Sequence, residues 1–302
     1  MATQTETTFR RWTIGDVKVT RIVESESVFD IPTLFPKASA EEVQRLDWLK
    51  PHFVTDDWQG KMSIHALVVE TPDLTIVVDT CIGNDRDRLA YETSNNLQTA
   101  FMEDFEAAGF DREKVDVVLC THLHFDHVGW NTMKQGGEWV PTFPNARYLF
   151  NRAEFEHWRD TQDDVTEDMF LNVQKNVFVD SVKPVIDAGL VDLVDENHRV
   201  CDEVSFEPTP GHSPGHVCVR LRSQGQEAFI TGDMVHHPFQ FANAEWSMAS
   251  VDYDSEMATA TRARVYGEVA DQPVLVIGTH FAGVTAGRVK RDGSAYRFDA
   301  EE

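Results

Sequence analysis

Residues 121–130, THLHFDHVGW, constrain the fold of this chain more than any other stretch. The apolar run VDVVLC at 115–120 comes before them, and such a run is typical of a strand covered on both faces. The end of a strand is a place where a sheet holds side chains rigidly. The sequence therefore predicts a buried strand that delivers four polar side chains within six positions: His122, His124, Asp126 and His127.

Three later apolar runs end on residues of the same kinds. The segment 205–216 supplies His212 and His216, AFITGD supplies Asp233, and VLVIGTH supplies His280. Imidazole and carboxylate groups are ligands suited to divalent ions such as zinc, and no cysteine stands at these positions. One histidine beside a glycine means little, but an ordered series of such strand ends predicts a metal centre.

The spacing predicts how two ions would be held. In extended backbone, residues i and i+2 point the same way, so His122 and His124 can bind one ion. After the turn, Asp126 and His127 can face a second ion, and a carboxylate such as Asp233 can bridge both. We expect two divalent metal ions as cofactors, with Zn²⁺ favoured and iron or manganese left open.

The rest of the chain reads as strands and helices of one domain over 1–302. Alternating or continuous apolar runs predict strands at 17–25, 66–71, 74–80, 191–194, 204–208 and 217–221. Helical spacing predicts helices at 38–49, 97–109 and 253–269. Asp292-Gly293 predicts a hairpin near the C-terminus. Residues 131–195 combine a loop-like stretch, one short strand pattern and helical patterns. They are expected to form a helical insertion or lid.

The segments THLHFDHVGW, TPGHSPGH, TGD and GTH, in this order, resemble the metallo-β-lactamase superfamily over most of the chain. The resemblance implies an α/β (α+β) fold, an αββα sandwich of two mixed β-sheets with helices outside and the metal site at one sheet edge. It also implies two ligand sets bridged by Asp233. These are His122, His124 and His212 for one ion, and Asp126, His127 and His280 for the other.

Two further residues are expected to support the ligands. DTCIGNDR resembles the family's first motif, in which the aspartate, here Asp79, anchors the metal site. His216 lies four residues after a ligand and is a second candidate for this role.

Departures from the family's patterns narrow the range of activities that we expect of this chain. β-Lactamases of the family have a cysteine where Asp233 stands, and flavodiiron oxygen reductases have a glutamate where His124 stands. The stretches DVVLCTHLHFDHVGWNT and TGDMVHHPFQ most resemble those of lactonases and of arylester or phosphotriester hydrolases. Glutathione thioesterases and single-iron persulfide dioxygenases are weaker alternatives. Such thioesterases bind their anionic substrate through basic residues near the C-terminus, and this chain has RVKR at 288–291. A non-enzymatic binding protein on the same scaffold is weaker still.

The hypothesis is a binuclear metal hydrolase that uses a bridging hydroxide to open a lactone or cleave a related neutral, hydrophobic ester. Asp126 and Asp233 are expected to take part in catalysis. Homoserine lactonases place a tyrosine three residues after the bridging aspartate, where this chain has His236. A histidine there can polarise a carbonyl or protonate a leaving group, or it can be merely structural. The apolar neighbours expected to line the pocket are Trp130, Phe239 and Phe281.

Composition limits the partners. The chain has 27 Lys and Arg against 51 Asp and Glu, a net charge of −24, so nucleic acid and anionic membrane surfaces are not expected partners. The polar N-terminal stretch lacks the apolar core of a secretory signal, and the four scattered cysteines suggest free thiols in a reducing compartment. We expect a cytoplasmic location, and assembly into a homo-oligomer is left open.

Overall fold

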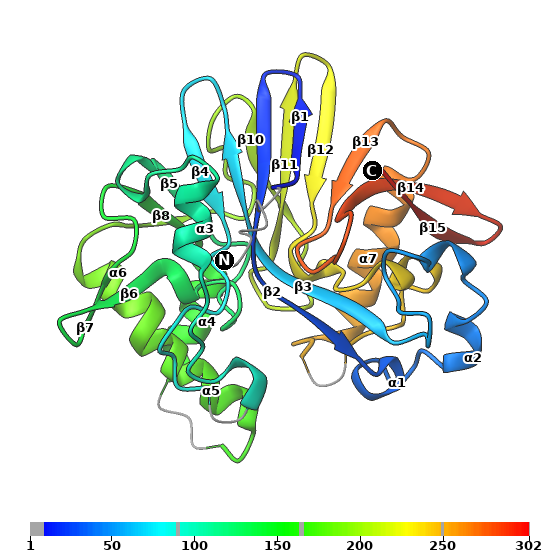
Figure 1. Cartoon of the computed structure of the whole chain (residues 1–302), viewed down its shortest axis with the longest axis horizontal. Helices are drawn as coiled ribbons and strands as arrows, with labels where there is room; N and C mark the ends of the chain where they lie inside the picture. Colours follow the sequence, from blue (N-terminus) through cyan, green and yellow to red (C-terminus); the bar gives the residue numbers. More distant parts are fainter. Residues whose placement is uncertain (1–8, 89–90, 163–165, 249–250, 302) are drawn as a thin grey trace, which may run out of the picture.

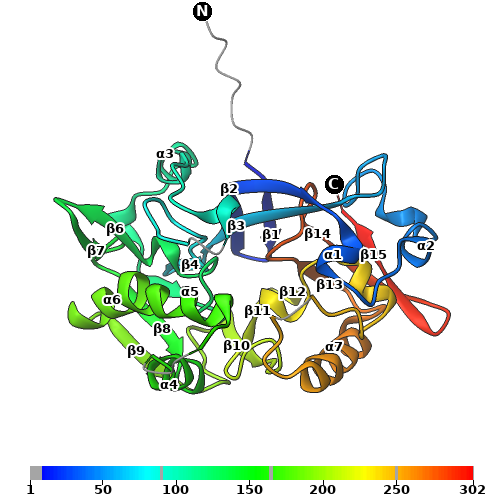
Figure 2. The same cartoon turned by 90° about the horizontal axis from the view of Figure 1, so that it is seen from below.

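Two mixed β-sheets face each other in the computed structural model, with helices on both outer sides (Figures 1 and 2). The structure describes residues 9–88, 91–162, 166–248 and 251–301. Within these, the first sheet pairs its strands in the order β1 (Arg11–Ile14), β2 (Val17–Phe29), β3 (Gly60–Glu70), β4 (Thr75–Val78), β5 (Val117–Leu119), β8 (Arg147–Asn151) and β9 (Val191–Val194). The second sheet follows the order β10 (Val204–Pro208), β11 (Val217–Ser223), β12 (Gln226–Ile230), β13 (Val274–Ile277), β14 (Ala286–Asp292) and β15 (Ala295–Ala300). A separate hairpin joins β6 (Thr132–Gln135) to β7 (Glu138–Pro141).

Helices cover the outer faces. The α-helices are α1 (Ile31–Leu34), α2 (Ala40–Val43), α3 (Phe101–Ala107), α4 (Arg152–Asp160), α5 (Met169–Val177), α6 (Lys183–Asp187) and α7 (Ser255–Val269). Short 3-10 turns are η1 (Asp47–Leu49), η2 (Glu92–Ser94), η3 (Arg112–Lys114), η4 (Gly129–Asn131), η6 (Gly232–Met234) and η7 (Pro238–Ala242), and η5 (Phe178–Val182) is π-helical. Figure 2 shows α4, α5 and α6 beside the first sheet and α7 beside the second.

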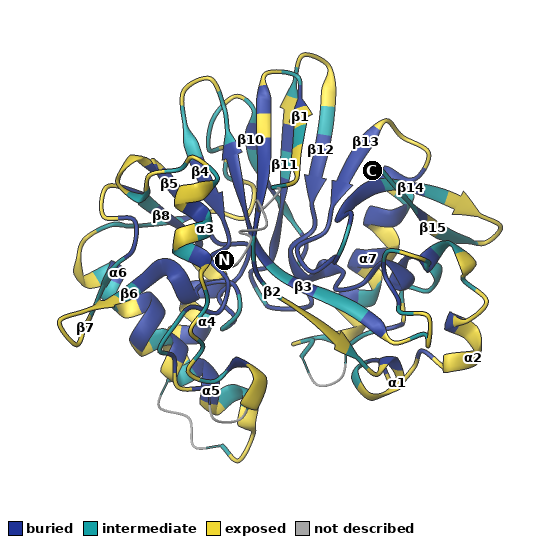
Figure 3. Cartoon of the chain, in the orientation of Figure 1, coloured by how far each residue is buried: buried dark blue, intermediate teal, exposed yellow. Residues whose placement is uncertain are grey.

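Three apolar layers hold the sandwich together. Val19 and Val69 of the first sheet pack with Val219 and Ile230 of the second in the layer between the sheets. A second cluster joins the outer face of the first sheet to α3–α6, and a third joins the second sheet to α1, α2 and α7. The buried residues accordingly follow the strands of both sheets, while exposed residues gather at outer turns (Figure 3). The αββα sandwich predicted from the motifs is confirmed.

The pairing of the strands explains where the polar side chains meet. β4, β5, β8 and β9 run parallel in the first sheet, and β12 and β13 run parallel in the second. The carboxyl ends of parallel strands meet at one edge of a sheet, which is where ligands bind in open α/β sheets. β5 is followed by the 121–130 loop, β12 by Asp233 and β13 by His280. Both sheets therefore deliver their ligand-bearing loops to a shared edge.

The prediction of an inserted lid at 131–195 is corrected in part. β8 pairs in parallel with β5, and β9 pairs in parallel with β8, so both are strands of the main sheet. Their connecting helices pack on that sheet through residues such as Phe155 and Val173. The sequence pattern was misread because short strands between helices look irregular, although this alternation is typical of parallel sheets. Residues 163–165 lie outside the described part of the chain.

Other predicted elements differ mainly in length. The helix expected at 38–49 is reduced to α2, which begins with a capping box between Ser39 and Glu42, followed by η1. The helix expected at 97–109 is α3, and the one expected at 253–269 is α7. The hairpin at Asp292-Gly293 joins β14 to β15 as predicted. Across the described ranges, the helices are all too short or too polar to cross a membrane.

Candidate metal centre

The loop after β5 turns tightly beneath its ligands. A Cβ on Gly129 would lie 1.8 Å from the carbonyl oxygen of Ile82, so only glycine fits at this position. The Gly129 N–H donates to the carbonyl of Cys81 at 2.7 Å, and that of Trp130 donates to the carbonyl of Thr80 at 2.7 Å. The loop that carries the first ligands is therefore fastened to the loop after β4.

All seven predicted ligands meet at the sheet edge. The ligand atoms of His122, His124 and His212 lie within 4.8 Å of one another. The same limit encloses a second set, which consists of Asp126, His127, Asp233 and His280. The structure therefore holds two buried clusters of the kind expected of a binuclear metal site.

Asp233 lies between the two clusters. Its Oδ1 is 3.0 Å from Nε2 of His280, and its Oδ2 is 3.2 Å from Nε2 of His127. The Oδ2 atom is also 3.5 Å from Nε2 of His212 and 3.8 Å from that of His122. One carboxylate thus faces imidazoles of both sets, which is the placement required of a bridging ligand.

Burial and neighbouring charges together set the pKa values of the site. Burial lowers the pKa of His122 and His124 well below the ordinary value, and neighbouring imidazoles lower it further. Burial also opposes a charge on His127, but Asp233, Asp126 and Asp79 outweigh it and raise the pKa of that imidazole. For Asp233, His127 and His280 outweigh burial and hold the pKa of the carboxyl far below its usual range.

Asp79, which follows β4, holds the loop after β5 at two points. Its Oδ1 accepts the backbone N–H of Thr121 at 2.8 Å, and its Oδ2 lies 2.9 Å from Nδ1 of His127. The hydroxyl of Thr121 donates to the same Oδ2 at 2.8 Å. Asp79 itself has φ +56°, a left-handed conformation that costs free energy outside glycine and is often found at functional sites. The structure thus places Asp79 where the family resemblance expects an anchor.

His216 and His236 flank Asp233 from two sides. The backbone N–H of Asp233 donates to Nε2 of His216 at 2.8 Å, and burial lowers the pKa of His216 to about 3, so this imidazole is a neutral acceptor. Nε2 of His236 lies 3.2 Å from Oδ2 of Asp233, and its buried Nδ1 has no hydrogen-bond partner among the residues that the structure describes. His216 therefore supports the main chain of Asp233, whereas His236 faces the cluster itself.

Three buried carboxylates of the site were missed in the sequence. Glu154 of α4 accepts N–H groups from Leu123 at 3.1 Å and Gly215 at 2.9 Å, so it joins the two histidine loops. Glu24 stands at a bulge in β2 and accepts the N–H groups of Ile82 and Gly83. The third, Asp252, contacts His212. The only local signal was the position of Glu154 on the apolar face of its helix, four residues before Trp158.

The prediction that three aromatic residues line a substrate pocket is corrected. The Trp130 indole donates to Glu24 at 2.7 Å, and its ring stacks on Phe101 with centroids 5.5 Å apart. Phe239 and Phe281 are fully buried in the cluster beneath the second sheet. Each follows a ligand motif closely in sequence, but the backbone turns its side chain into the core.

Other aromatic residues lie close to predicted ligands and are only partly buried. Asp126 is the most exposed of the seven ligands, with 18% of its side chain accessible. The ring of Phe125, next to it, stacks on Tyr91 with centroids 5.0 Å apart. The Phe170 ring meets His124 edge-on at 4.8 Å, and both Phe125 and Phe170 are only partly buried. Met169, the neighbour of Phe170, is 63% exposed.

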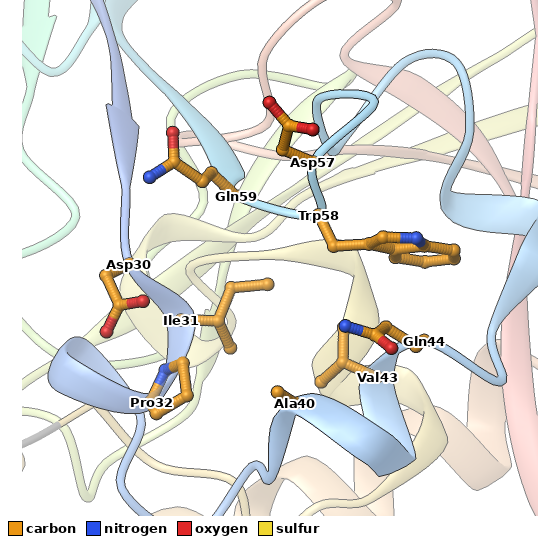
Figure 4. A pocket seen from close by; sticks show the side chains of 9 residues that line it. All are labelled: Asp30, Ile31, Pro32, Ala40, Val43, Gln44, Asp57, Trp58 and Gln59. Carbon is orange, nitrogen blue, oxygen red and sulfur yellow. The ribbon is translucent and has the colours of Figure 1, made fainter.

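A separate cavity of about 310 Å³ lies between α1, α2 and the turn at 57–59. Figure 4 shows its lining, which is Asp30, Ile31, Pro32, Ala40, Val43, Gln44, Asp57, Trp58 and Gln59. Among the described residues, this lining includes none of the predicted metal ligands. The cavity is therefore not the candidate metal centre.

The donor set fits divalent cations. Nε2 of His212 and Nδ1 of His124 face each other at 3.0 Å, and Nε2 of His280 and Nε2 of His127 face each other at 3.3 Å. Within the described part of the chain, the buried Nε2 of His122 has no hydrogen-bond partner. Ring nitrogens aimed at one another in a buried site need a proton or a cation between them. The imidazole and carboxylate donors suit zinc and related ions.

A family model described as the metallo-beta-lactamase superfamily matches residues 60–280. The chain belongs to the metallo-β-lactamase superfamily. This range contains all seven predicted ligands, so the superfamily match covers the whole candidate metal centre. The resemblance inferred from the four histidine and aspartate motifs is thereby confirmed.

Similar proteins include lactonases. An N-acyl homoserine lactonase of a Bacillus species is 23% identical over 172 residues, 56% of this chain and 58% of that protein. The lactonase AttM of Rhizobium radiobacter is 28% identical over 126 residues, 40% of this chain and 41% of its own length. The chain thus spans less than two thirds of the length of these curated relatives.

Solved structures agree over nearly the whole chain. The dizinc quorum-quenching lactonase AidC, in complex with its N-hexanoyl-L-homoserine product, superposes with a TM-score of 0.79, 20% identity and 97% coverage of both chains. The hydrolase AbOPH superposes with a TM-score of 0.79, 23% identity and the same coverage. At these identities the superpositions establish the fold.

Proposed function

We propose that this chain is a zinc-dependent hydrolase that opens the ring of a lactone carrying an apolar substituent. The observation that carries the proposal is the position of Asp233 between two buried ligand sets. N-acyl homoserine lactonases among the similar proteins support this choice of substrate class.

The metal-binding residues have defined parts in this proposal. His122, His124 and His212 would hold one ion, and Asp126, His127 and His280 the other, with Asp233 shared. Two such ions lower the pKa of water toward neutrality and polarise an ester carbonyl.

Two side chains are placed to handle the substrate's oxygen atoms. Asp126 combines a ligand position with partial exposure, so its second oxygen can receive a proton and pass it to the leaving alkoxide. His236 stands beside Asp233, its Nδ1 has no partner in the ranges that the structure describes, and a ring nitrogen that carries a proton can donate to the carbonyl or the leaving oxygen. Both roles use groups already fixed by the protein, so little reorganisation accompanies the reaction.

The partly exposed rings of Phe125, Tyr91 and Phe170 favour a substrate with an apolar group. They lie beside Asp126 and His124, on the accessible side of the cluster. Burial of an alkyl chain against such rings contributes about 25 cal/mol for each Å² of apolar surface removed from water. This surface is therefore proposed to receive the acyl chain, in place of the core residues predicted from the sequence.

The direct test is hydrolysis by the zinc-loaded protein across a panel of compounds. N-acyl homoserine lactones and simple lactones are expected to be opened with kcat/KM at least about 100-fold above those for a thioester, a β-lactam and a persulfide. The rate of ring opening is measured from the protons that the acid product releases. A preference for aryl esters or phosphotriesters would reassign the substrate class, and full zinc occupancy without turnover of any compound would contradict the proposal.

Phe170→Ala is expected to reduce kcat/KM for a ten-carbon acyl lactone by about tenfold, with a smaller loss for a four-carbon one, because the longer chain covers more of the ring. Val179→Ala serves as the control, since it removes an exposed apolar side chain from η5. Steady-state kinetics over the chain-length series measure the effect. An equal loss for both acyl lengths would contradict a role for Phe170 in binding the chain.

A further inference from the structure

Asp252 contacts a predicted metal ligand from a distant part of the chain. Its Oδ1 lies 3.1 Å from Nδ1 of His212, and both side chains are at most 3% exposed. Nε2 of His212, on the other side of the ring, faces His124 and Asp233. The imidazole therefore lies between a carboxylate and the metal-binding cluster.

A buried arginine holds the other oxygen of Asp252. Both terminal nitrogens of Arg262, on α7, lie 3.5 Å from Oδ2 of Asp252. The same guanidinium donates to the carbonyl of Ala244 at 2.7 Å and to the hydroxyl of Ser247 at 2.6 Å, so its position is fixed by several partners. The carboxylate thus has one oxygen directed to α7 and the other to His212.

Main-chain contacts hold the backbone of the His212 loop independently of Asp252. The N–H of Tyr253 donates to the carbonyl of His212, and that of Asp254 donates to the carbonyl of Gly211, both at 2.9 Å. Asp254 also caps α7 by accepting the N–H of Met257. The loop is therefore attached to the start of α7 through its backbone. Because this attachment does not need the Asp252 side chain, the contact of that side chain with His212 can serve to orient the imidazole.

We propose that Asp252 is a positioning residue that keeps the proton of His212 on Nδ1. Nε2 is then directed at the first site, where His122, His124 and His212 would hold a metal ion. A neutral imidazole binds a metal through the nitrogen that carries no proton, and a carboxylate on the opposite nitrogen selects this tautomer. Asp79 has the same relation to His127 in the second ligand set. Each ligand set thus contains a histidine oriented by a buried carboxylate, although only Asp79 belongs to a motif that the sequence revealed.

The inference rests on the metal site of the proposed function and is independent of the lactone substrate. The test is a Zn²⁺ titration of the metal-free protein against a chromophoric chelator, for the wild type and Asp252→Asn. The asparagine keeps the shape but removes the charge. We expect the affinity for one of the two ions to fall by about 10- to 100-fold, because partners of metal ligands usually contribute this much. The affinity for the other ion is expected to change little.

Two measurements separate orientation from folding. The thermal midpoint of the metal-free protein measures the loss of stability at the buried Arg262, which loses its charged partner. The visible absorption of the Co²⁺-loaded protein is expected to change, because the ligand field at the first site is altered. Glu256→Gln, an exposed substitution in the first turn of α7, is the matched control.

Binding of both ions by Asp252→Asn with wild-type affinity, or an unchanged Co²⁺ spectrum, would overturn the inference while leaving the proposed function intact. Weaker zinc binding by the variant, in a protein that opens no lactone, would support the inference and count against the proposed substrate.

Discussion

Asp233→Ala is expected to retain at most one tightly bound zinc ion per chain and to lose at least about a thousandfold in kcat for lactone hydrolysis. The reason is geometric. This carboxylate faces His280 through one oxygen and His127 and His212 through the other, so it is the side chain that both ligand sets share. Its removal leaves two cations facing each other without the negative charge between them.

Metal content after extensive dialysis and steady-state rates check this expectation. Asp195→Ala is the control for the loss of one negative charge, because Asp195 is exposed and belongs to neither predicted ligand set. The wild-type metal content together with wild-type turnover in Asp233→Ala would show that Asp233 is not a bridging ligand.

Glu154→Ala is expected to lower the free energy of unfolding by about 3–5 kcal/mol, because three buried donors lose their acceptor. These donors are the backbone N–H groups of Leu123 and Gly215 and the indole N–H of Trp158. Since Leu123 lies between two ligands and Gly215 follows a third, we also expect weaker zinc binding.

Urea unfolding of the metal-free protein measures the stability change, and Glu156→Ala is the control because Glu156 is exposed on the same helix. A change below about 1 kcal/mol for Glu154→Ala would mean that water or neighbouring groups replace the carboxylate.

The clustering of the predicted ligands could be foreseen because they lie in short segments at strand ends. His122, His124 and His127 follow one strand, and Asp233 and His280 each follow another. Ligand chemistry limits the residue types, and strand geometry limits their directions, so local sequence carries most of the information about this part of the site.

The supporting carboxylates could not be predicted because their partners are remote. Glu154 contacts Gly215 across 61 residues, and Asp252 contacts His212 across 40. Glu24 is directed inward by a bulge in β2, which has no clear signature in the sequence. Such contacts depend on how the two sheets and their helices pack.

The prediction that Trp130 and Phe281 line the pocket was wrong because it relied too much on local sequence. Both residues adjoin ligand motifs in sequence, and this proximity suggested a pocket wall. A residue one to three positions from a predicted ligand can lie on the other side of the backbone, and here both rings pack in apolar clusters. The partly buried rings proposed to receive the acyl chain, Tyr91 and Phe170, come from segments that carry none of the predicted ligands.

Zinc titration of the metal-free chain, with bound metal and lactone hydrolysis measured on the same samples, tests the binuclear centre most directly. Two ions are expected to bind per chain, and full activity is expected only when both sites are filled. Full activity with one ion per chain, or the absence of tight zinc binding, would contradict it.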